Sequence, residues 1–238
     1  MMITSLTNEK IKNLLKLKNA KNRQKDGLFL VEGPHLVSEA KMAGVLVEAY
    51  TIKEQYEGTL VSEAVMKKIC QTDSVVPQIG VCKIKNEQII ANRVLILDGV
   101  QDPGNLGTIL RSAKAFGFDS VFLSKGTVDV YNDKVIRSSQ GAIFKLNFLY
   151  GDKLEFIKEI SKTHHVYSTN VVNGKTPKNI DFPLKLVLIL GNEGNGVSNE
   201  INDLMLDNLY IPMDNMESLN VGVAGSILMY EIATSTKK

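Results

Sequence analysis

The sequence predicts an α/β fold with a mostly parallel sheet, and three observations support this prediction. Residues 94–97 and 186–190 are short runs of Val, Leu and Ile, which are typical of strands buried on both faces of a sheet. Strand-like and helix-like segments alternate along much of the chain. Glycines such as Gly44 and Gly117 follow helix-like segments, where helices commonly end.

The predicted elements form two groups, separated by a polar stretch at 85–92 that we interpret as a linker. In the first group, Pro34 begins a helix that ends before Gly44. The strands expected there are 28–31, 45–52 and 75–84, and the helices are 34–43 and 62–69. In the second group, the strands expected are 94–97, 120–123, 166–169, 186–190 and 209–211, and the helices are 106–116, 135–139, 153–161 and 219–233. We therefore expect two domains, at residues 1–88 and 89–238.

Positive charge is concentrated at the N-terminus. The net charge of the chain is +2, but its first 25 residues hold seven basic side chains and a single acidic one. If Thr7 caps a helix, Ile11, Leu14 and Leu15 fall on one face and the lysines cover the other. Such a cationic face suits the phosphate backbone of a nucleic acid. A charged face that only keeps the protein solvated is the alternative.

The composition excludes several classes of protein. With 44% hydrophobic and 23% charged residues, the chain is too apolar to be intrinsically disordered. No apolar run approaches the roughly 18 residues of a membrane span, and the N-terminus lacks the apolar core of a signal peptide, so we expect a cytoplasmic protein without a membrane partner. Cys70 and Cys82 form no C-x-x-C pair and the three histidines lack zinc-ligand spacing, which argues against a metal site or a disulfide scaffold.

The candidate site lies in the loops that follow three predicted strands, because ligands of parallel sheets bind beyond the carboxyl ends of the strands. The loop after 94–97 leads into a helix whose free N–H groups could bind an anion, with Arg111 inside that helix. The loop after 186–190 reads Gly191-Asn192-Glu193-Gly194-Asn195-Gly196, which matches neither the dinucleotide fingerprint nor the P-loop and so disfavours an oxidoreductase. Its glycines permit close approach to a flat ligand such as adenosine. A capped helix and a tight turn are the structural alternatives.

Together, the three loops resemble the signature motifs of the SpoU, or TrmH-like, family of RNA ribose 2′-O-methyltransferases in the SPOUT superfamily. The matching stretches are Asn105-x-Gly107-x-x-x-Arg111 for motif one, Leu190-Gly191-Asn192-Glu193-Gly194-x-Gly196 for motif two, and Ile211-Pro212-Met213 with Ser218-Leu219-Asn220-Val221 for motif three. Upstream, 29–33 and 77–80 resemble parts of the family's ribosomal-protein-like RNA-binding domain. Gly222 departs from the pattern, since many members have serine there.

The resemblance implies a C-terminal SPOUT methyltransferase domain with a parallel sheet and a deep trefoil knot, preceded by a small α/β RNA-binding domain. It also implies S-adenosylmethionine as cofactor and a homodimer whose second subunit helps to complete the site. The implied cofactor-binding positions are Leu190, Gly191, Gly196, Ile211, Met213, Ser218 and Leu219. The implied catalytic positions are Arg111, Asn105, Glu193, Ser218 and Asn220. The residues expected to contact RNA are Lys12, Lys16, Lys18, Arg23, Arg111 and Arg137.

The expected reaction is methyl transfer from S-adenosylmethionine to a ribose 2′-hydroxyl of structured RNA. Because an arginine stays protonated in proteins, we expect Arg111 to clamp a phosphate rather than to act as a base. A dedicated N-terminal domain favours ribosomal RNA over transfer RNA by analogy, and DNA is not an expected partner. A transfer RNA 2′-O-methyltransferase and a non-catalytic RNA-binding protein that keeps the fold are the alternatives.

Overall fold

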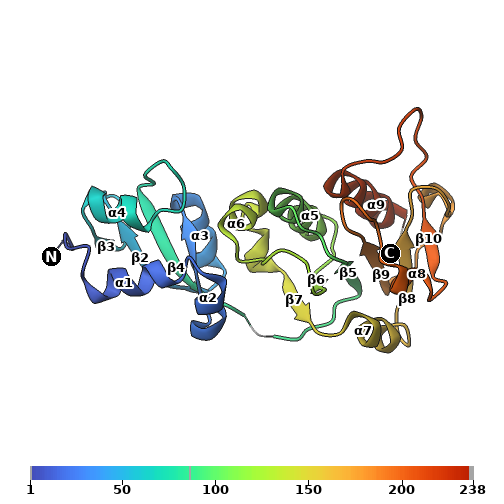
Figure 1. Cartoon of the computed structure of the whole chain (residues 1–238), viewed down its shortest axis with the longest axis horizontal. Helices are drawn as coiled ribbons and strands as arrows, with labels where there is room; N and C mark the ends of the chain where they lie inside the picture. The colour runs from blue at the N-terminus through green and yellow to red at the C-terminus, as the bar shows by residue number, and fades with distance from the viewer. Residues whose placement is uncertain (1, 86, 236–238) are drawn as a thin grey trace. The chain divides into compact units, whose positions relative to one another are not determined.

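The computed structural model describes residues 2–85 and 87–235, and their contacts divide the chain into two units. One unit is Met1–Lys85 with Tyr131–Phe144, and the other is Asn86–Val130 with Lys145–Lys238; each contains its own sheet (Figure 1). The segment 131–144, which the predicted boundary at residue 88 assigns to the second domain, groups with the first unit. The ring of Phe29 explains this grouping, because it lies 4.6 Å from that of Tyr131 and 6.3 Å from that of Phe144, measured between centroids.

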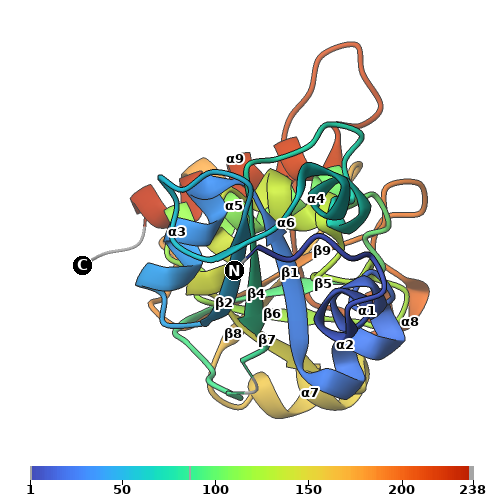
Figure 2. The same cartoon turned by 90° about the vertical axis from the view of Figure 1, so that its left-hand side faces the viewer.

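The first unit is built on a four-stranded sheet in the order β1-β4-β2-β3. Its strands are β1 (Leu28–Glu32), β2 (Leu46–Thr51), β3 (Thr59–Leu60) and β4 (Gln78–Lys83). Its helices are α1 (Glu9–Lys16), α2 (Ala20–Asp26), α3 (Pro34–Met42), α4 (Glu63–Ile69) and α6 (Asp133–Ser139), with the 3₁₀ helix η1 (Ala142–Lys145) at its end. β4 is antiparallel to both β1 and β2, which lie on either side of it (Figure 2). The expectation of a mostly parallel sheet is therefore wrong for this unit.

The lysine-rich N-terminal segment forms two short helices. Asn8, rather than Thr7, caps α1, because its side chain accepts a hydrogen bond from the Lys10 N–H at 2.9 Å. Ile11 and Leu14 are buried in the core of the first unit, as expected from their helical spacing, and Leu15 is partly buried beside them. The lysines of this segment thus stand on helices that are anchored to the unit by an apolar face.

The second unit is a six-stranded parallel sheet in the order β10-β8-β9-β5-β6-β7, as the sequence predicts for this region. Its strands are β5 (Arg93–Leu97), β6 (Ser120–Leu123), β7 (Asn147–Tyr150), β8 (His165–Thr169), β9 (Leu186–Leu190) and β10 (Asp207–Leu209). Its helices are α5 (Pro103–Ala115), α7 (Lys153–Ile160), α8 (Asn199–Asn202) and α9 (Val221–Ser235), with the 3₁₀ helix η2 (Pro177–Asn179). β7 and α8 were not expected. Among the described residues, no helix is both long and apolar enough to cross a bilayer.

The two central strands of this sheet bring the candidate loops together. β5 and β9 are parallel neighbours whose last residues, Leu97 and Leu190, are paired in register. Every residue of β9 is at most 1% exposed. Helices α5 and α9 pack against each other on one side of the sheet, and α7 lies on the other (Figure 1). The loops that follow β5 and β9 therefore start from adjacent, rigid points. The deep trefoil knot that the resemblance implies stays a prediction.

A buried carboxylate connects these two loops. Asp98 directly follows β5 and is 5% exposed. Its carboxylate accepts hydrogen bonds from the Ser198 N–H at 2.8 Å, the Lys153 ammonium at 3.0 Å and the Ser124 hydroxyl at 3.4 Å. Burial alone raises the pKa of Asp98, but the N–H and hydroxyl of Ser198 and the ammonium of Lys153 together hold this pKa below its ordinary value. The ionised form of Asp98 thus joins the loop after β5, the loop after β9 and the start of α7.

Replacing Asp98 by asparagine is expected to lower the free energy of unfolding at pH 7 by about 1–3 kcal/mol, because a buried charge-assisted contact is lost. A lowered pKa in the folded state stabilises the protein above the unfolded-state value of about 4, and this contribution disappears as the pH falls through the folded-state pKa. Urea unfolding at several pH values should therefore show the gap between wild type and Asp98→Asn narrowing toward pH 4 and below. The exposed Asp73→Asn serves as the control, and an equal loss in both variants would contradict this role.

Candidate functional site

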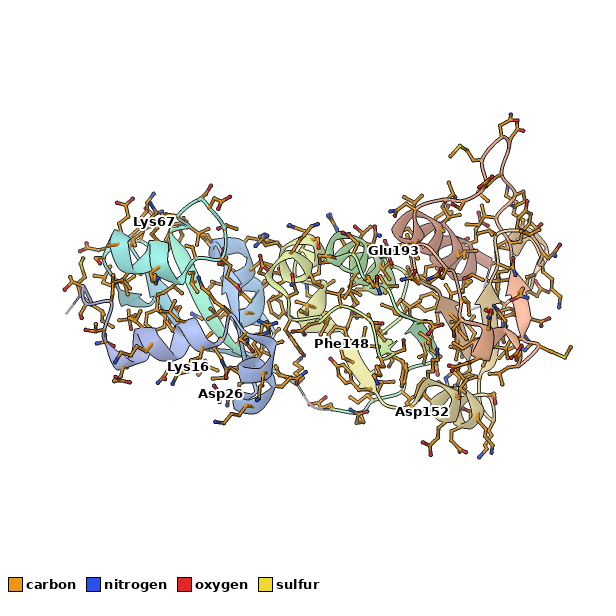
Figure 3. All side chains as sticks on the ribbon, in the orientation of Figure 1. Lys16, Asp26, Lys67, Phe148, Asp152 and Glu193 are labelled. Carbon is orange, nitrogen blue, oxygen red and sulfur yellow. The ribbon has the colours of Figure 1, made fainter. Side chains whose placement is uncertain are left out.

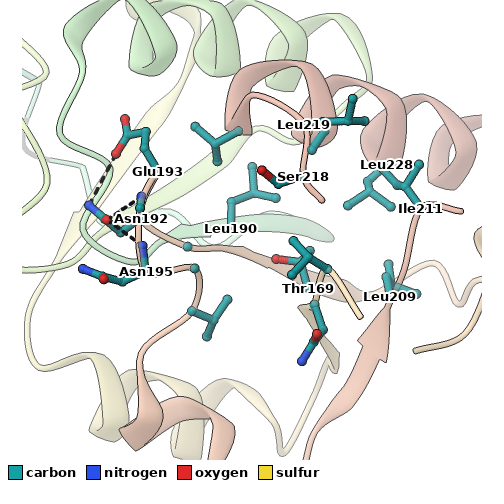
Figure 4. Close-up of a pocket in the computed structure, with 18 of the residues that line it drawn as sticks. Thr169, Leu190, Asn192, Glu193, Asn195, Leu209, Ile211, Ser218, Leu219 and Leu228 are labelled. Carbon is teal, nitrogen blue, oxygen red and sulfur yellow. Dashed lines mark hydrogen bonds between the residues drawn. The ribbon is translucent and has the colours of Figure 1, made fainter. Parts of the chain in front are cut away.

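A cavity of about 390 Å³ opens at the carboxyl ends of the neighbouring strands β8, β9 and β10 (Figure 4). Its walls come from the ends of β8, β9 and β10, from the loops after β8 and β9, from the end of α8, from 211–219 and from α9. All of the positions implied for cofactor binding line this cavity, namely Leu190, Gly191, Gly196, Ile211, Met213, Ser218 and Leu219. The fold thus gathers residues from two separated motifs into one recess, and their role in binding stays a prediction.

The glycines of the loop after β9 are required by the close approach of its backbone. A Cβ atom on Gly191 would lie 2.0 Å from the carbonyl carbon of Gly196 and 2.2 Å from the nitrogen of Val197. Two backbone hydrogen bonds of 2.9 Å between Asn192 and Gly196 close the loop, and Gly196 adopts a positive φ of 66°. Any side chain at position 191 would therefore force this wall of the cavity to move.

Asn192 fixes the position of this loop, a role that we did not expect for it. Its Oδ1 accepts hydrogen bonds from the N–H groups of Gly194 at 2.9 Å and Asn195 at 3.1 Å. Its Nδ2 donates to the carbonyl oxygen of Gly99 at 2.8 Å, across to the loop after β5. The signal in the sequence was an asparagine within a glycine-rich turn, where such side chains commonly bond to the backbone two residues on.

Glu193 makes a second, stronger connection between the two loops. Its carboxylate accepts hydrogen bonds from the Asp102 N–H at 2.9 Å, the Gln101 N–H at 3.1 Å and the Asn105 side-chain amide at 3.1 Å. Burial raises the pKa of Glu193, but these N–H donors outweigh it and hold this pKa below its ordinary value. Glu193 is therefore an anion at neutral pH, and it serves here as a hydrogen-bond acceptor.

Asn105 and Asn220 extend this connection to the third loop. The Nδ2 of Asn220 donates to the Oδ1 of Asn105 at 2.9 Å. The Oδ1 of Asn220 accepts a hydrogen bond from the Gly222 N–H at 2.9 Å, in the first turn of α9. The side-chain amide of Asn105 is therefore oriented from both ends, by Glu193 on one side and by Asn220 on the other. Three of the five implied catalytic residues thus form one hydrogen-bonded row.

Arg111 and Ser218 stand outside that row. Ser218 is exposed in the wall of the cavity. Arg111 is exposed on α5, does not line the cavity, and within the described residues its guanidinium has no hydrogen-bond partner. The structure thus places Arg111 on the same helix as Asn105, as a cation available to a ligand from solution.

The residues expected to contact RNA divide into two groups. Lys12 and Lys16 are exposed on α1, where each bonds to a neighbour on its own helix. Arg137 is partly exposed and pairs with Asp133 at 2.6 Å. The ammonium of Lys18 donates to carbonyl oxygens at the end of α4, at 2.7 and 3.0 Å, and Arg23 is 6% exposed with its guanidinium bonded to carbonyls. This arrangement favours a structural role for Lys18 and Arg23 over RNA contact.

Comparison with known proteins places this geometry in a family. Residues 92–230 match the family model described as the SpoU rRNA Methylase family, and residues 8–79 match one described as the MRM3-like substrate binding domain. The chain is 35% identical over 243 residues to the Bacillus subtilis (strain 168) protein named 23S rRNA (guanosine(2553)-2′-O)-methyltransferase RlmP, covering 97% of this chain and 98% of that protein.

Solved structures agree along the whole chain. An AdoMet-bound rRNA methyltransferase from Sinorhizobium meliloti has a TM-score of 0.86 at 26% identity, covering 100% of this chain and 99% of the other. A structure described as an RNA 2′-O ribose methyltransferase has a TM-score of 0.82 at 29% identity, covering 99% of each chain. Because the first family model spans more than half of the sequence and the Bacillus protein matches almost all of it, the chain belongs to the SpoU rRNA methylase family.

Proposed function

We propose that this protein transfers a methyl group from S-adenosylmethionine to a ribose 2′-hydroxyl of ribosomal RNA. The observation that carries the proposal is the cavity lined by residues of motifs two and three beside the hydrogen-bonded row Glu193–Asn105–Asn220. The Bacillus relative is named for a 23S ribosomal RNA, which favours ribosomal over transfer RNA for this chain. A non-catalytic RNA-binding protein would need no such cavity.

The cavity fits S-adenosylmethionine in size and in chemistry. Its volume of about 390 Å³ lies within the range of roughly 300–1,000 Å³ that small-ligand sites occupy. Leu190, Ile211 and Leu219 supply apolar contact for the flat face of an adenine. Within the described residues, the main-chain N–H groups of Gly191, Ile211 and Leu219 have no hydrogen-bond partner, so they are available to acceptor atoms of a bound nucleoside.

The residues around the cavity divide the work of the reaction. Bound S-adenosylmethionine supplies an electrophilic methyl group on its sulfonium. The guanidinium of Arg111 holds a phosphate next to the target ribose, since it is permanently charged and presents a planar fork of donors. Asn105, oriented at both ends, positions the ribose or the arginine relative to the cavity. Removal of the 2′-hydroxyl proton is assisted by an RNA phosphate or a neighbouring group, because Arg111 cannot accept it. DNA lacks this hydroxyl and is not a substrate.

We also propose that the protein works as a homodimer that covers one face of α9. Val223, Ile227 and Tyr230 are 47%, 37% and 51% exposed, and their spacing of four and three residues places them on one face of that helix. The same helix provides Val221 and Ala224 to the cavity wall. A second copy that covers the exposed face would lie next to the cavity and help to complete it.

Replacing Gly191 by valine is expected to raise the dissociation constant for S-adenosylmethionine more than tenfold, measured by isothermal titration calorimetry. The physical reason is the missing space, since even a Cβ atom would meet the carbonyl carbon of Gly196 at 2.0 Å. Gly194→Ala, in the same loop, is the matched control, because its Cβ atom would approach only Asn192 Oδ1, at 3.6 Å. Unchanged affinity in Gly191→Val would place the cofactor elsewhere.

Replacing Arg111 by alanine is expected to lower the single-turnover methylation rate about a hundredfold or more, while the affinity for S-adenosylmethionine changes less than twofold. Arg111→Lys keeps the charge but loses the planar fork, so a severe defect in this variant too would indicate geometric clamping of phosphate. Lys114→Ala removes a charge from the same helix and should cost at most a few-fold. Near-normal rates in Arg111→Ala, under saturating RNA and cofactor, would move the catalytic role to another residue.

Val223→Asp is expected to convert the dimer to a monomer in sedimentation velocity experiments, because a charge would be buried at the proposed interface. An aspartate near the start of a helix does not oppose its dipole, so α9 should remain folded. The control is Val172→Asp, which places the same charge at another exposed valine, 71% exposed. If Val223→Asp sediments as wild type does, the interface lies on a different face.

A further inference from the structure

We infer that a second cavity, in the first unit, binds one unpaired nucleotide of the RNA; this inference rests on the proposed function. The cavity measures about 360 Å³, and all of its lining residues belong to α1, α2, their flanking residues and the strands β1 and β4. Its volume is again within the range of small-ligand sites, roughly 300–1,000 Å³. No part of the proposed mechanism uses it.

The apolar part of this cavity suits the face of a base. It comes from Leu14, Leu17, Leu28 and Val81, of which Leu14, Leu17 and Val81 are at most 4% exposed and so are fixed by the core. An unpaired base has lost its stacking partners, and proteins commonly offer its face a flat or apolar surface instead. Leu28, which is only partly buried, is therefore the apolar side chain that a base can contact, and the three buried residues hold the floor of the recess rigid beneath it.

The polar part of the cavity suits the rest of a nucleotide. Lys16 and Lys25 are two basic residues that line the recess, and the ammonium of Lys16 donates to the side chain of Asn13 at 2.9 Å. Figure 3 labels Lys16 on α1 and Asp26 at the end of α2. The lysines can neutralise the phosphates on either side of a nucleotide, while the amides of Asn13 and Asn22 and the carboxylate of Asp26 can hydrogen-bond to a base edge.

Arg23 holds the corner that shapes this cavity. Its guanidinium donates to the carbonyl oxygens of Leu17 at 3.0 Å and Lys18 at 2.9 Å, where α1 ends and the chain turns toward α2. The side-chain amide of Asn22 donates to the carbonyl of Lys16 at 3.0 Å, in the same turn. These contacts fix the angle between the two helices, so the recess exists before any ligand arrives.

The combination of walls favours an unpaired nucleotide over a duplex. A duplex keeps its bases stacked inside and presents only phosphates and sugars to a recess of this kind. It would meet the lysines but leave the apolar wall unfilled. A nucleotide turned out of a loop or bulge satisfies both parts of the cavity at once, and loops and bulges are where RNA is usually recognised by its bases.

The first test compares two double variants that remove equal charge from the full-length protein. The probe is unmodified 23S ribosomal RNA made by transcription, with affinity measured by filter binding at several salt concentrations. Lys16→Gln with Lys25→Gln should weaken binding at least tenfold at about 0.1 M salt. It should also reduce the magnitude of the slope of log K against log salt by about 1.4, because each of the two lost phosphate contacts contributes about 0.7. Lys53→Gln with Lys67→Gln, at exposed sites outside the cavity, should change the affinity and the salt slope by little. Equal losses in the two double variants would overturn the inference.

The second test changes no charge. Asn13→Leu and, independently, Asn22→Leu should each weaken binding several-fold with an unchanged salt slope. Asn13→Leu removes a base-edge contact, whereas Asn22→Leu also removes the hydrogen bond to the Lys16 carbonyl that fixes the turn. Chemical probing of the bases should show one unpaired nucleotide protected by wild type and by the Lys53/Lys67 control, but exposed with the cavity variants. Two variants guard against misfolding, which thermal unfolding reports separately. Wild-type affinity and protection in both asparagine variants would overturn the inference.

These binding tests are independent of the methylation assay. If wild type methylates ribosomal RNA while all variants bind alike, the nucleotide cavity is wrong and the proposed function stands. If wild type methylates no RNA but the cavity variants lose binding and protection selectively, the proposed function is wrong and the cavity stands.

Discussion

The carboxylate of Glu193 is the contact on which the arrangement of the candidate site depends, because it joins loops that start from neighbouring strands. It satisfies two main-chain N–H groups in the loop after β5 and the side-chain amide of Asn105. Charge-assisted hydrogen bonds of this kind are stronger than neutral ones and fix direction as well as distance. The side chain of Asn105 also accepts a hydrogen bond from Asn220, so the hydrogen-bonded row extends from Glu193 to the start of α9. The three motifs therefore behave as one connected structure although they are far apart in the sequence.

Arg111 differs from this row in a way that fits its proposed role. Glu193, Asn105 and Asn220 are hydrogen-bonded to one another, whereas the guanidinium of Arg111 has no hydrogen-bond partner among the described residues. An arginine that was already bonded to a carboxylate would have to lose that partner before it could hold a phosphate. A prearranged cavity and an uncommitted cation outside it thus separate the binding of a cofactor, which needs rigidity, from the capture of RNA, which needs an available charge.

The sequence predicted most elements because burial leaves a clear pattern, but it could not predict strand direction in the first unit. The runs 94–97 and 186–190 are buried on both faces and were recognisable as central strands for that reason. The same reasoning failed for the first sheet, since apolar spacing reports which side chains are buried and not which strand lies beside which. β4 lies between β1 and β2 and runs against both. Short elements such as β3 and α8 carry too few residues to show any period.

For the candidate site, motif positions could be located from the sequence, whereas the use made of each charge could not. Lys16 and Lys18 are two residues apart and of the same type, yet only Lys18 donates to main-chain carbonyls at a helix end. Arg23 is buried for the same reason. The last carbonyls of a helix need donors, and a nearby lysine or arginine can supply them. In this short, basic pair of helices, some cationic side chains therefore bond to main-chain carbonyls at helix ends. Where each helix ends decides which of the other lysines are available to RNA.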